Sequence, residues 1–234
     1  MMHTRLLAVL AHPDDESFLM GGTLARYAAE GVDVVVVTAT RGEAGQGDPD
    51  PKRNGQRRER ELREAVAVLG VKALQVLGYP DGRLAQVPRP LLVRRVLDSI
   101  QAWAAGVVLT FGPDGISGHA DHVTIGEVTR EAVMSVEAKV GLFQVVPSPA
   151  TRQCCRRGAG AFDATGLTAV DITAYRVLKV RAMQCHRSQP QPFLGEPETI
   201  AGQLIDHEYF RLAWPPVGAF PPTDLFDAPG RPSR

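Results

Sequence analysis

The fold is decided by the stretch Leu6-Leu7-Ala8-Val9-Leu10-Ala11-His12-Pro13-Asp14-Asp15-Glu16. Its apolar first half is typical of a parallel strand that is buried on both faces. One histidine and three acids follow at once, and the carboxyl ends of parallel strands are where open α/β sheets bind ligands. Acidic groups this close repel one another unless a cation or a proton neutralises them. The stretch therefore predicts a buried strand that ends in a functional site; the competing interpretation is an acidic turn that only caps the next helix.

Strands and helices alternate further along the chain. Apolar runs predict strands at 32–38, 73–77, 107–111 and 141–146, and helices at 23–30, at 56–69, after Pro88 and Pro90, and after His122. In the second of these helices, Leu62, Ala65, Val66 and Leu69 recur at the spacing of one helix face. This alternation predicts the α/β class, with a Rossmann-like doubly wound sheet that is mainly parallel.

The part of the chain after Pro147 is less regular. A helix is predicted at 173–186 and a late strand at 208–214, and no linker separates a second domain. The residues from about 215 to 234 are rich in proline, which predicts an extended or mobile tail. We therefore expect a single domain over residues 1–234 with an irregular C-terminal part.

Composition argues against several classes of protein. Lys+Arg and Asp+Glu number 26 each, and a formal net charge of zero disfavours binding to nucleic acid or to anionic lipid. No apolar run approaches the roughly 18 residues of a membrane span, and the N-terminus lacks the features of a signal peptide. Cys154, Cys155 and Cys185 form no disulfide framework, which is typical of a reducing compartment. We therefore predict a cytoplasmic protein without nucleic-acid or membrane partners.

A second polar motif, Gly118-His119-Ala120-Asp121-His122, follows the strand predicted at 107–111. Two histidines three residues apart can lie on one face of a helical turn, whereas a lone histidine is more often packed or on the surface. Two histidines and a carboxylate with an open fourth position form a catalytic zinc pattern, which iron(II) fits as well. Hydrolysis of a carbonyl group also needs a general base and a proton donor or positive charge. Aspartate and histidine, the types of Asp14 and His119, suit those two roles.

Together these two motifs closely resemble those of the LmbE-like/PIG-L family of zinc-dependent N-deacetylases. The family includes the N-acetylglucosaminyl-inositol and N-acetylglucosaminyl-malate deacetylases of mycothiol and bacillithiol synthesis. Further matches lie at Gly21–Leu24, Thr40–Glu43, Leu77–Gly82 and His186–Gln189, so the resemblance covers roughly residues 5–190. Ser117 departs from it, because some mycothiol-pathway members have a tyrosine there.

The resemblance implies a metal site and a set of catalytic groups. The residues that would bind zinc are His12, Asp15 and His122. Asp14 would be the general base, and His119 would be the protonated group that stabilises the oxyanion or protonates the leaving amine. Asp121 would orient His119 and sustain its charge. Arg58 and Asp81 match positions that grip the sugar, although Arg58 could also belong to a solvated, salt-bridged helix face.

The sequence thus predicts a zinc hydrolase that removes the acetyl group from a small N-acetylglucosamine-type substrate. Two alternatives stay open at this point: an amidase of the same fold that cleaves a thiol-sugar S-conjugate, and a metal-binding module without catalysis. A dinucleotide-binding oxidoreductase is rejected because the first loop lacks Gly-x-Gly-x-x-Gly. Assembly into a homo-oligomer and the roles of Glu43, His186 and His207 are left open.

Overall fold

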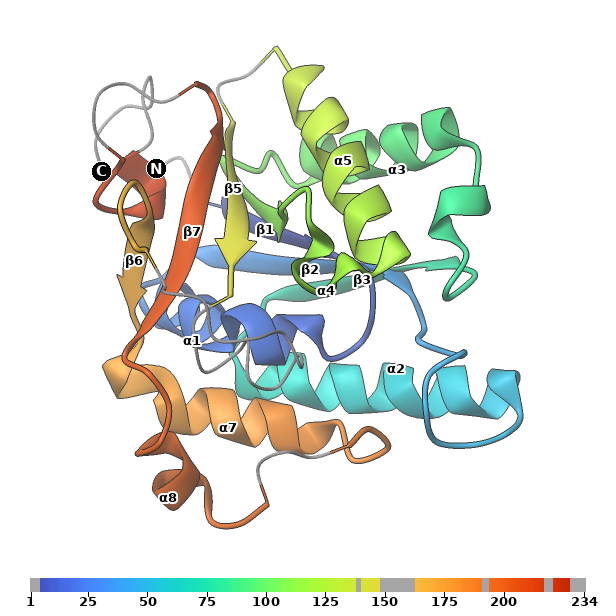
Figure 1. The fold of residues 1–234 in the computed structure, drawn as a ribbon, viewed down its shortest axis with the longest axis vertical. Coiled ribbons are helices and arrows are strands. Elements are labelled where there is room, and N and C mark those ends of the chain that lie inside the picture. Colours follow the sequence, from blue (N-terminus) through green and yellow to red (C-terminus); the bar gives the residue numbers. More distant parts are fainter. Residues whose placement is uncertain (1–4, 138–139, 148–162, 191–193, 217–220, 228–234) are drawn as a thin grey trace.

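The computed structural model describes residues 5–137, 140–147, 163–190, 194–216 and 221–227 (Figure 1). Cys154 and Cys155, and most of the proline-rich tail, lie outside these residues. The described part forms a 7-stranded sheet with the strand order β3-β2-β1-β4-β5-β7-β6. Among its helices, none has the length and the apolar character needed to cross a lipid bilayer.

Five neighbouring strands of the sheet are parallel, as predicted. They are β1 (Arg5–Leu10), β2 (Asp33–Thr40), β3 (Ala73–Tyr79), β4 (Val107–Phe111) and β5 (Gly141–Val146). The side chains of β1 from Leu6 onward and the four valines of β2 are almost fully buried, which explains their unbroken apolar runs. The predicted doubly wound, mainly parallel α/β fold is thereby confirmed.

The sheet ends in two antiparallel strands, which the sequence analysis foresaw only in part. β7 (His207–Trp214) pairs with β5, and β6 (Thr168–Asp171) pairs with β7. The predicted late strand corresponds to β7. The four-residue β6 was not predicted, because only its alternate residues are buried and it carries no apolar run.

Helices cover both faces of the sheet. Figure 1 shows α1, α2 and α7 on one face and α3 and α5 on the other. The helical elements are α1 (Asp15–Ala29), α2 (Pro51–Val68), α3 (Arg89–Ala102), α4 (Gly115–Gly118), α5 (Ala120–Met134), α7 (Arg176–Cys185) and α8 (Pro197–Ala201), with short 3₁₀ turns η1 (Leu84–Gln86), η2 (Thr173–Tyr175) and η3 (Leu225–Asp227).

Several helices begin earlier than predicted. α1 begins at Asp15 rather than near residue 23, and α5 begins at Ala120 rather than after His122. α2 begins at Pro51, because the Asp50 carboxylate accepts hydrogen bonds from the backbone N–H groups of Lys52 and Arg53. Both polar motifs therefore lie at the first turn of a helix, directly after a parallel strand.

A buried ion pair joins α7 to α1 through β7. The Lys179 Nζ lies 2.6 Å from Glu208 Oε1, and both side chains are less than a tenth exposed. The Glu208 carboxylate also accepts hydrogen bonds from the backbone N–H groups of Gly22 and Thr23. α1 is interrupted at Met20, whose φ and ψ are −144° and 19°, so Glu208 caps the second half of that helix.

One part of the proline-rich tail packs into the core, which corrects the prediction of an extended tail. Leu225 and Phe226 are 0% and 5% exposed. The Phe226 ring lies edge-on to Tyr27, with 5.3 Å between ring centroids, and the Tyr27 hydroxyl donates to Asp224. The two hydrophobic residues between prolines were too short a signal to predict this contact.

Replacing Phe226 by alanine is expected to lower the free energy of unfolding by about 3–5 kcal/mol, because a buried aromatic side chain is lost. Leu194→Ala is the control, since Leu194 is 82% exposed and its loss is expected to change stability by less than about 0.5 kcal/mol. Urea denaturation of both variants makes the comparison. Equal stability of the two variants would show that the tail contributes nothing to the core.

Candidate metal centre

The two polar motifs meet at one edge of the sheet. β1 and β4 are neighbours and parallel, so the loops that follow them emerge side by side at their carboxyl ends. The first loop carries His12 and leads into α1, and the second carries His119 and leads into α5. The turn after β3 joins them, because the backbone N–H groups of Gly82 and Leu84 donate to the Asp121 carboxylate.

Three side chains of these motifs bring donor atoms together. His12 Nδ1 lies 3.1 Å from His122 Nε2 and 3.7 Å from Asp15 Oδ2, and His122 Nε2 lies 3.4 Å from Asp15 Oδ1. Metal–ligand bonds of about 2.0–2.1 Å in a tetrahedron put neighbouring ligand atoms about 3.3–3.4 Å apart. The donor types and their spacing therefore fit one divalent metal ion with a fourth position left open. We call these three residues the metal-binding triad.

His12 also belongs to two other groups of residues whose side chains could bind a metal ion. One is His12 with His119 and His122, and the other is His12 with Asp81 and Asp121; in each, the ligand atoms lie within 4.8 Å of one another. The orientation of the His12 ring favours the triad over the second group. Its Nδ1 faces His122 and Asp15, whereas its Nε2 lies 3.1 Å from Asp81 and 3.2 Å from Asp121.

Asp81 and Asp121 thus lie behind the metal-binding triad. A carboxylate that accepts the Nε2 hydrogen of a histidine fixes the ring tautomer and leaves Nδ1 free to bind a metal. The family resemblance implied other roles, in which Asp81 grips the sugar and Asp121 orients His119, and these stay predictions. Between Asp121 and His119, the backbone N–H of Asp121 donates to His119 Nδ1 at 3.2 Å.

His122 is held in its neutral form. Its Nδ1 is 3.1 Å from the carbonyl oxygen of Gly115, to which it donates, so that Nε2 keeps a free electron pair. The ring stacks on Phe111, with 4.1 Å between ring centroids. Burial, followed by the charge of His12, lowers the pKa of His122 to about 4.

The pKa of His12 is shifted in the opposite direction. Burial alone would lower the pKa of His12, but hydrogen bonds to Asp121 and Asp81 and the charge of Asp15 outweigh it and raise the pKa to about 10. At neutral pH the metal-free triad therefore holds a proton on His12 that a metal ion must displace.

Metal binding is accordingly expected to release about one proton at pH 7–8, because His12 is protonated below about pH 10 and must bind the metal as the neutral ring. Apparent affinity should then fall about tenfold for each unit by which the pH is lowered in this range. Calorimetric titration of the metal-free protein in buffers of different ionisation enthalpy measures the proton count. A binding heat that does not depend on the buffer would contradict this state of His12.

Asp14 lies beside the metal-binding triad. Its side chain is 26% exposed, and its carboxylate is 3.1 Å from Arg58 Nη2. Burial and the neighbouring charge of Asp15 raise the pKa of Asp14 to about 6, against the lowering effect of Arg58. The charge of Asp14 in turn acts on His122. A carboxylate with a raised pKa next to a metal site is suited to accept a proton from water.

His119 is exposed, and its ring lies 4.8 Å from that of His12 and 5.0 Å from that of His122, measured between centroids. Burial of the ring and the charges of His12 and His122 lower the pKa of His119, although Asp121 and Asp15 act in the opposite direction. Because His119 Nδ1 accepts the Asp121 N–H, the hydrogen of the neutral ring lies on Nε2.

Arg58 is buried, so its interpretation as part of a solvated helix face is wrong. Its Nη1 donates to the carbonyl oxygen of Gly42, and its Nη2 donates to that of Pro13 at 2.6 Å as well as to Asp14. The guanidinium fits there only because Gly42 and Gly45 have no side chain: a Cβ atom would come within 2.4 and 2.2 Å of Nη1. The role of Arg58 toward a sugar stays a prediction.

Sequence reasoning left three further residues without a role. Glu43 accepts a hydrogen bond from the Asp81 N–H, which fixes the turn after β3. His186 is fully buried and lies 2.7 Å from Glu16, so it packs behind the first motif. His207 makes a ring contact with Tyr209 on β7. The signal for His186 was its place in the segment His186–Gln189, which resembles the family.

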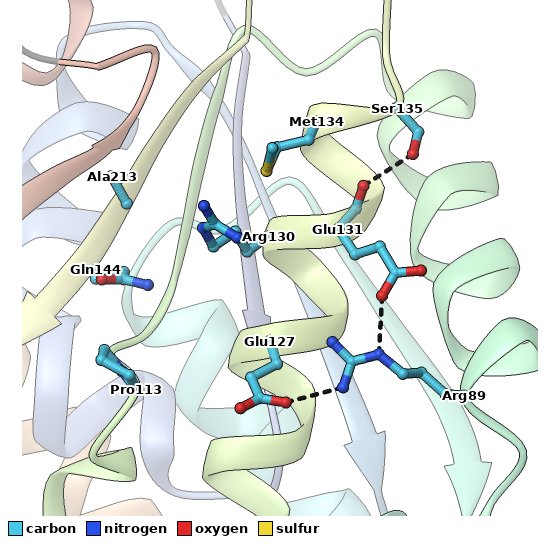
Figure 2. Close-up of a pocket in the computed structure, with 9 residues that line it drawn as sticks. All are labelled: Arg89, Pro113, Glu127, Arg130, Glu131, Met134, Ser135, Gln144 and Ala213. Atoms are coloured by element: carbon cyan, nitrogen blue, oxygen red, sulfur yellow. Dashed lines mark hydrogen bonds and ion pairs between the residues drawn. The ribbon is translucent and has the colours of Figure 1, made fainter.

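A cavity of about 720 Å³ lies elsewhere, between α5 and strands β5 and β7 (Figure 2). Arg130 points into it, and Arg89 at its rim pairs with Glu127 and Glu131. Of its lining residues, Pro113 alone comes from the loop that carries the second motif. The cavity contains none of the candidate site residues and is separate from the metal-binding triad.

Comparison with known proteins identifies the family of this chain. The family model described as PIG-L, GlcNAc-PI de-N-acetylase, matches residues 7–133. The 1D-myo-inositol 2-acetamido-2-deoxy-alpha-D-glucopyranoside deacetylase of Saccharomonospora viridis is 35% identical, over 94% of this chain and 99% of its own.

Two solved structures share the fold. The conserved protein TT1542 of Thermus thermophilus aligns with a TM-score of 0.65 and 26% identity, over 92% of this chain and 96% of its own. The N,N'-diacetylchitobiose deacetylase of Pyrococcus horikoshii aligns with a TM-score of 0.67 and 22% identity, over 90% of this chain and 84% of its own. The family model covers more than half of the residues, and the chain therefore belongs to the PIG-L family.

Proposed function

We propose that this protein is a metal-dependent hydrolase that removes the acetyl group from an N-acetylglucosamine-type substrate. The observation that carries the proposal is the metal-binding triad, with Asp14 next to it in the chain and the exposed His119 near its two histidines. Its relative from Saccharomonospora viridis is named as a deacetylase of an acetamido sugar linked to inositol, which supports a small amino-sugar substrate.

His12, Asp15 and His122 would hold the metal, and zinc is the metal that we propose. Two imidazoles and one carboxylate are typical of catalytic zinc, and iron(II) accepts the same donors. A divalent ion there supplies a Lewis acid that polarises the amide carbonyl and makes water more acidic. Asp81 and Asp121 keep the Nε2 of His12 occupied, so that its Nδ1 is presented to the metal.

Asp14 is the proposed general base. Its carboxylate takes the proton of the attacking water, and Arg58 keeps it in place through the contact at 3.1 Å. His119 is the proposed proton donor: in its protonated, imidazolium form it would give a proton to the nitrogen of the leaving amine as the carbon–nitrogen bond breaks, and the neutral ring would remain. A metal-binding module without catalysis would not need Asp14 and His119 in addition to the metal ligands, which argues against that alternative.

The compartment is part of the same proposal. Three cysteines without a pairing pattern are typical of a reducing compartment, and Cys185, the one within the described residues, is a free thiol. This supports a cytoplasmic location. Assembly into a homo-oligomer stays an open question.

The function is tested by measuring acetate and free amine released from a panel of N-acetylglucosaminides, with metal content determined on the same sample. The panel contains inositol and malate glycosides, simple N-acetylglucosaminides and an S-conjugated thiol sugar. We expect equal amounts of acetate and amine from at least one N-acetylglucosaminide, lost on chelation and restored by zinc. Cleavage of the S-conjugate alone would favour the amidase, and metal-loaded protein that releases no acetate from any of them would refute deacetylation.

A further inference from the structure

The backbone of Asp14 has an uncommon conformation. Its φ and ψ are 114° and −29°, and among the described residues only Ala104 and Ile116 are other non-glycine residues with a positive φ. Residues with a side chain rarely adopt this region, and they do so where the surrounding structure holds them. The contacts that hold the Asp14 backbone therefore affect the direction in which its carboxylate points.

Glu16 holds the amide of Asp14 from two residues further along the chain. The Asp14 N–H donates to Glu16 Oε2 at 3.0 Å. The carbonyl oxygen of Asp14 accepts hydrogen bonds from the N–H groups of Ser17 and Phe18, which form the first turn of α1. Both peptide groups of Asp14 are thus fixed, one by the helix and the other by the side chain of Glu16.

Glu16 is itself held by groups that cannot move freely. Its side chain is fully buried, and its Oε1 lies 2.5 Å from the Ser17 hydroxyl and 2.7 Å from His186 Nε2. His186 is also fully buried and follows α7, 170 residues further along the chain. With Oε1 tied to His186, the other oxygen is aimed at the Asp14 amide.

The turn after His186 is anchored on two other elements. Ser188 donates to Glu61 of α2 through both its N–H and its hydroxyl, and the Gln189 side chain donates to the carbonyl oxygen of Gln46, in the loop after β2. His186 is therefore fixed relative to the same elements that carry Arg58 and its partner Gly42.

We propose that Glu16 is a positioning residue that, backed by His186, holds the Asp14 peptide so that the Asp14 carboxylate faces the metal-binding triad. The proposal rests on the proposed function, in which Asp14 accepts a proton from water. Glu16 does not touch the substrate or the metal on this account; it acts through Asp14. The competing view is that the buried Glu16–His186 pair only stabilises the fold.

The test compares substitutions of two buried glutamates. Each glutamate accepts hydrogen bonds from backbone N–H groups, Glu16 at the residue before α1 and Glu208 within α1. Glu16→Met removes the acceptor of the Asp14 amide, whereas Glu208→Met removes the acceptor of the Gly22 and Thr23 amides. We expect Glu16→Met to keep its metal and KM within about twofold and to lose about 10- to 100-fold in kcat, because a misplacement of about 1 Å costs on that order. Glu208→Met should keep kcat within about twofold.

Two further variants separate positioning from general stability. Glu16→Gln retains an oxygen that can accept the Asp14 amide, and should recover kcat to within about threefold of the wild type. Combining Glu16→Met with Asp14→Asn should lower kcat no further than Asp14→Asn alone, because the effect passes through Asp14. Equal losses of kcat in Glu16→Met and Glu208→Met, or losses that multiply in the double variant, would overturn the proposal.

A measurement that does not need turnover completes the test. Crystal structures of the metal-loaded wild type, Glu16→Gln and Glu16→Met should show Asp14 leaving the positive-φ region only in Glu16→Met, with the metal-binding triad unchanged. Where Glu16→Met does not fold, His186→Gln takes its place in the structural comparison. An Asp14 φ that stays near 114° after loss of either partner contradicts the positioning role, whereas absence of deacetylation in the wild type contradicts only the proposed function.

Discussion

Replacing His122 by alanine is expected to remove the bound metal and the hydrolytic activity together. The metal-binding triad offers only three protein ligands, and the loss of one leaves His12 and Asp15, whose donor atoms are 3.7 Å apart. Two ligands do not hold a divalent ion against dialysis in the way that three do. Metal content of the dialysed protein and acetate release on the same sample measure the two effects, and both should fall to background.

His119→Ala is the matched control, because it separates the triad from the other group of histidines. If His119 bound the metal with His12 and His122, its loss would release the ion as His122→Ala does. Asp15 supports the triad because its two oxygens lie 3.7 Å from His12 Nδ1 and 3.4 Å from His122 Nε2, close to the edge of a tetrahedral site. We therefore expect His119→Ala to retain one metal per chain and to lose about 10²-fold in kcat as a proton donor is removed. Loss of metal from His119→Ala with retention in Asp15→Ala would reverse the assignment.

The parallel part of the fold could be predicted because its signals are local. The valines of β2 and the apolar run of β1 are buried on both faces, so hydrophobicity alone marks them. The start of α1 could not be predicted in this way. Asp15, Glu16 and Ser17 are polar yet buried, because their partners come from loops and from α7, far along the chain.

The meeting of the two motifs could likewise be predicted, whereas the groups behind His12 could not. The two motifs place their histidines and acids at neighbouring strand ends, which follows from the strand order alone. That Asp81 and Asp121 both face one nitrogen of His12 depends on how the turn after β3 crosses the site, and this turn is set by Glu43 and by backbone hydrogen bonds. No spacing in the sequence encodes that contact.

Replacing Asp14 by asparagine is expected to keep the metal and to lower kcat by at least about 10²-fold. Asparagine retains the shape of the side chain and an oxygen that can accept from Arg58, but it cannot take a proton from water. Because Asp14 is not in the metal-binding triad, the metal content should stay at one per chain. Asp171→Asn, which changes an exposed aspartate on β6, is the control and should leave kcat unchanged.

The pH dependence of kcat/KM tests the same role of Asp14 as the general base. A general base works in its unprotonated form, and burial with the charge of Asp15 raises the pKa of Asp14 to about 6. The activity of the wild type should therefore be full above this value and fall as the pH drops through it. A bound dication favours the carboxylate and moves the midpoint further down, so we expect it at or below about pH 6. The residual activity of Asp14→Asn should lack this fall at low pH. A metal-loaded Asp14→Asn variant that keeps both its turnover and the fall at low pH would show that another group is the base.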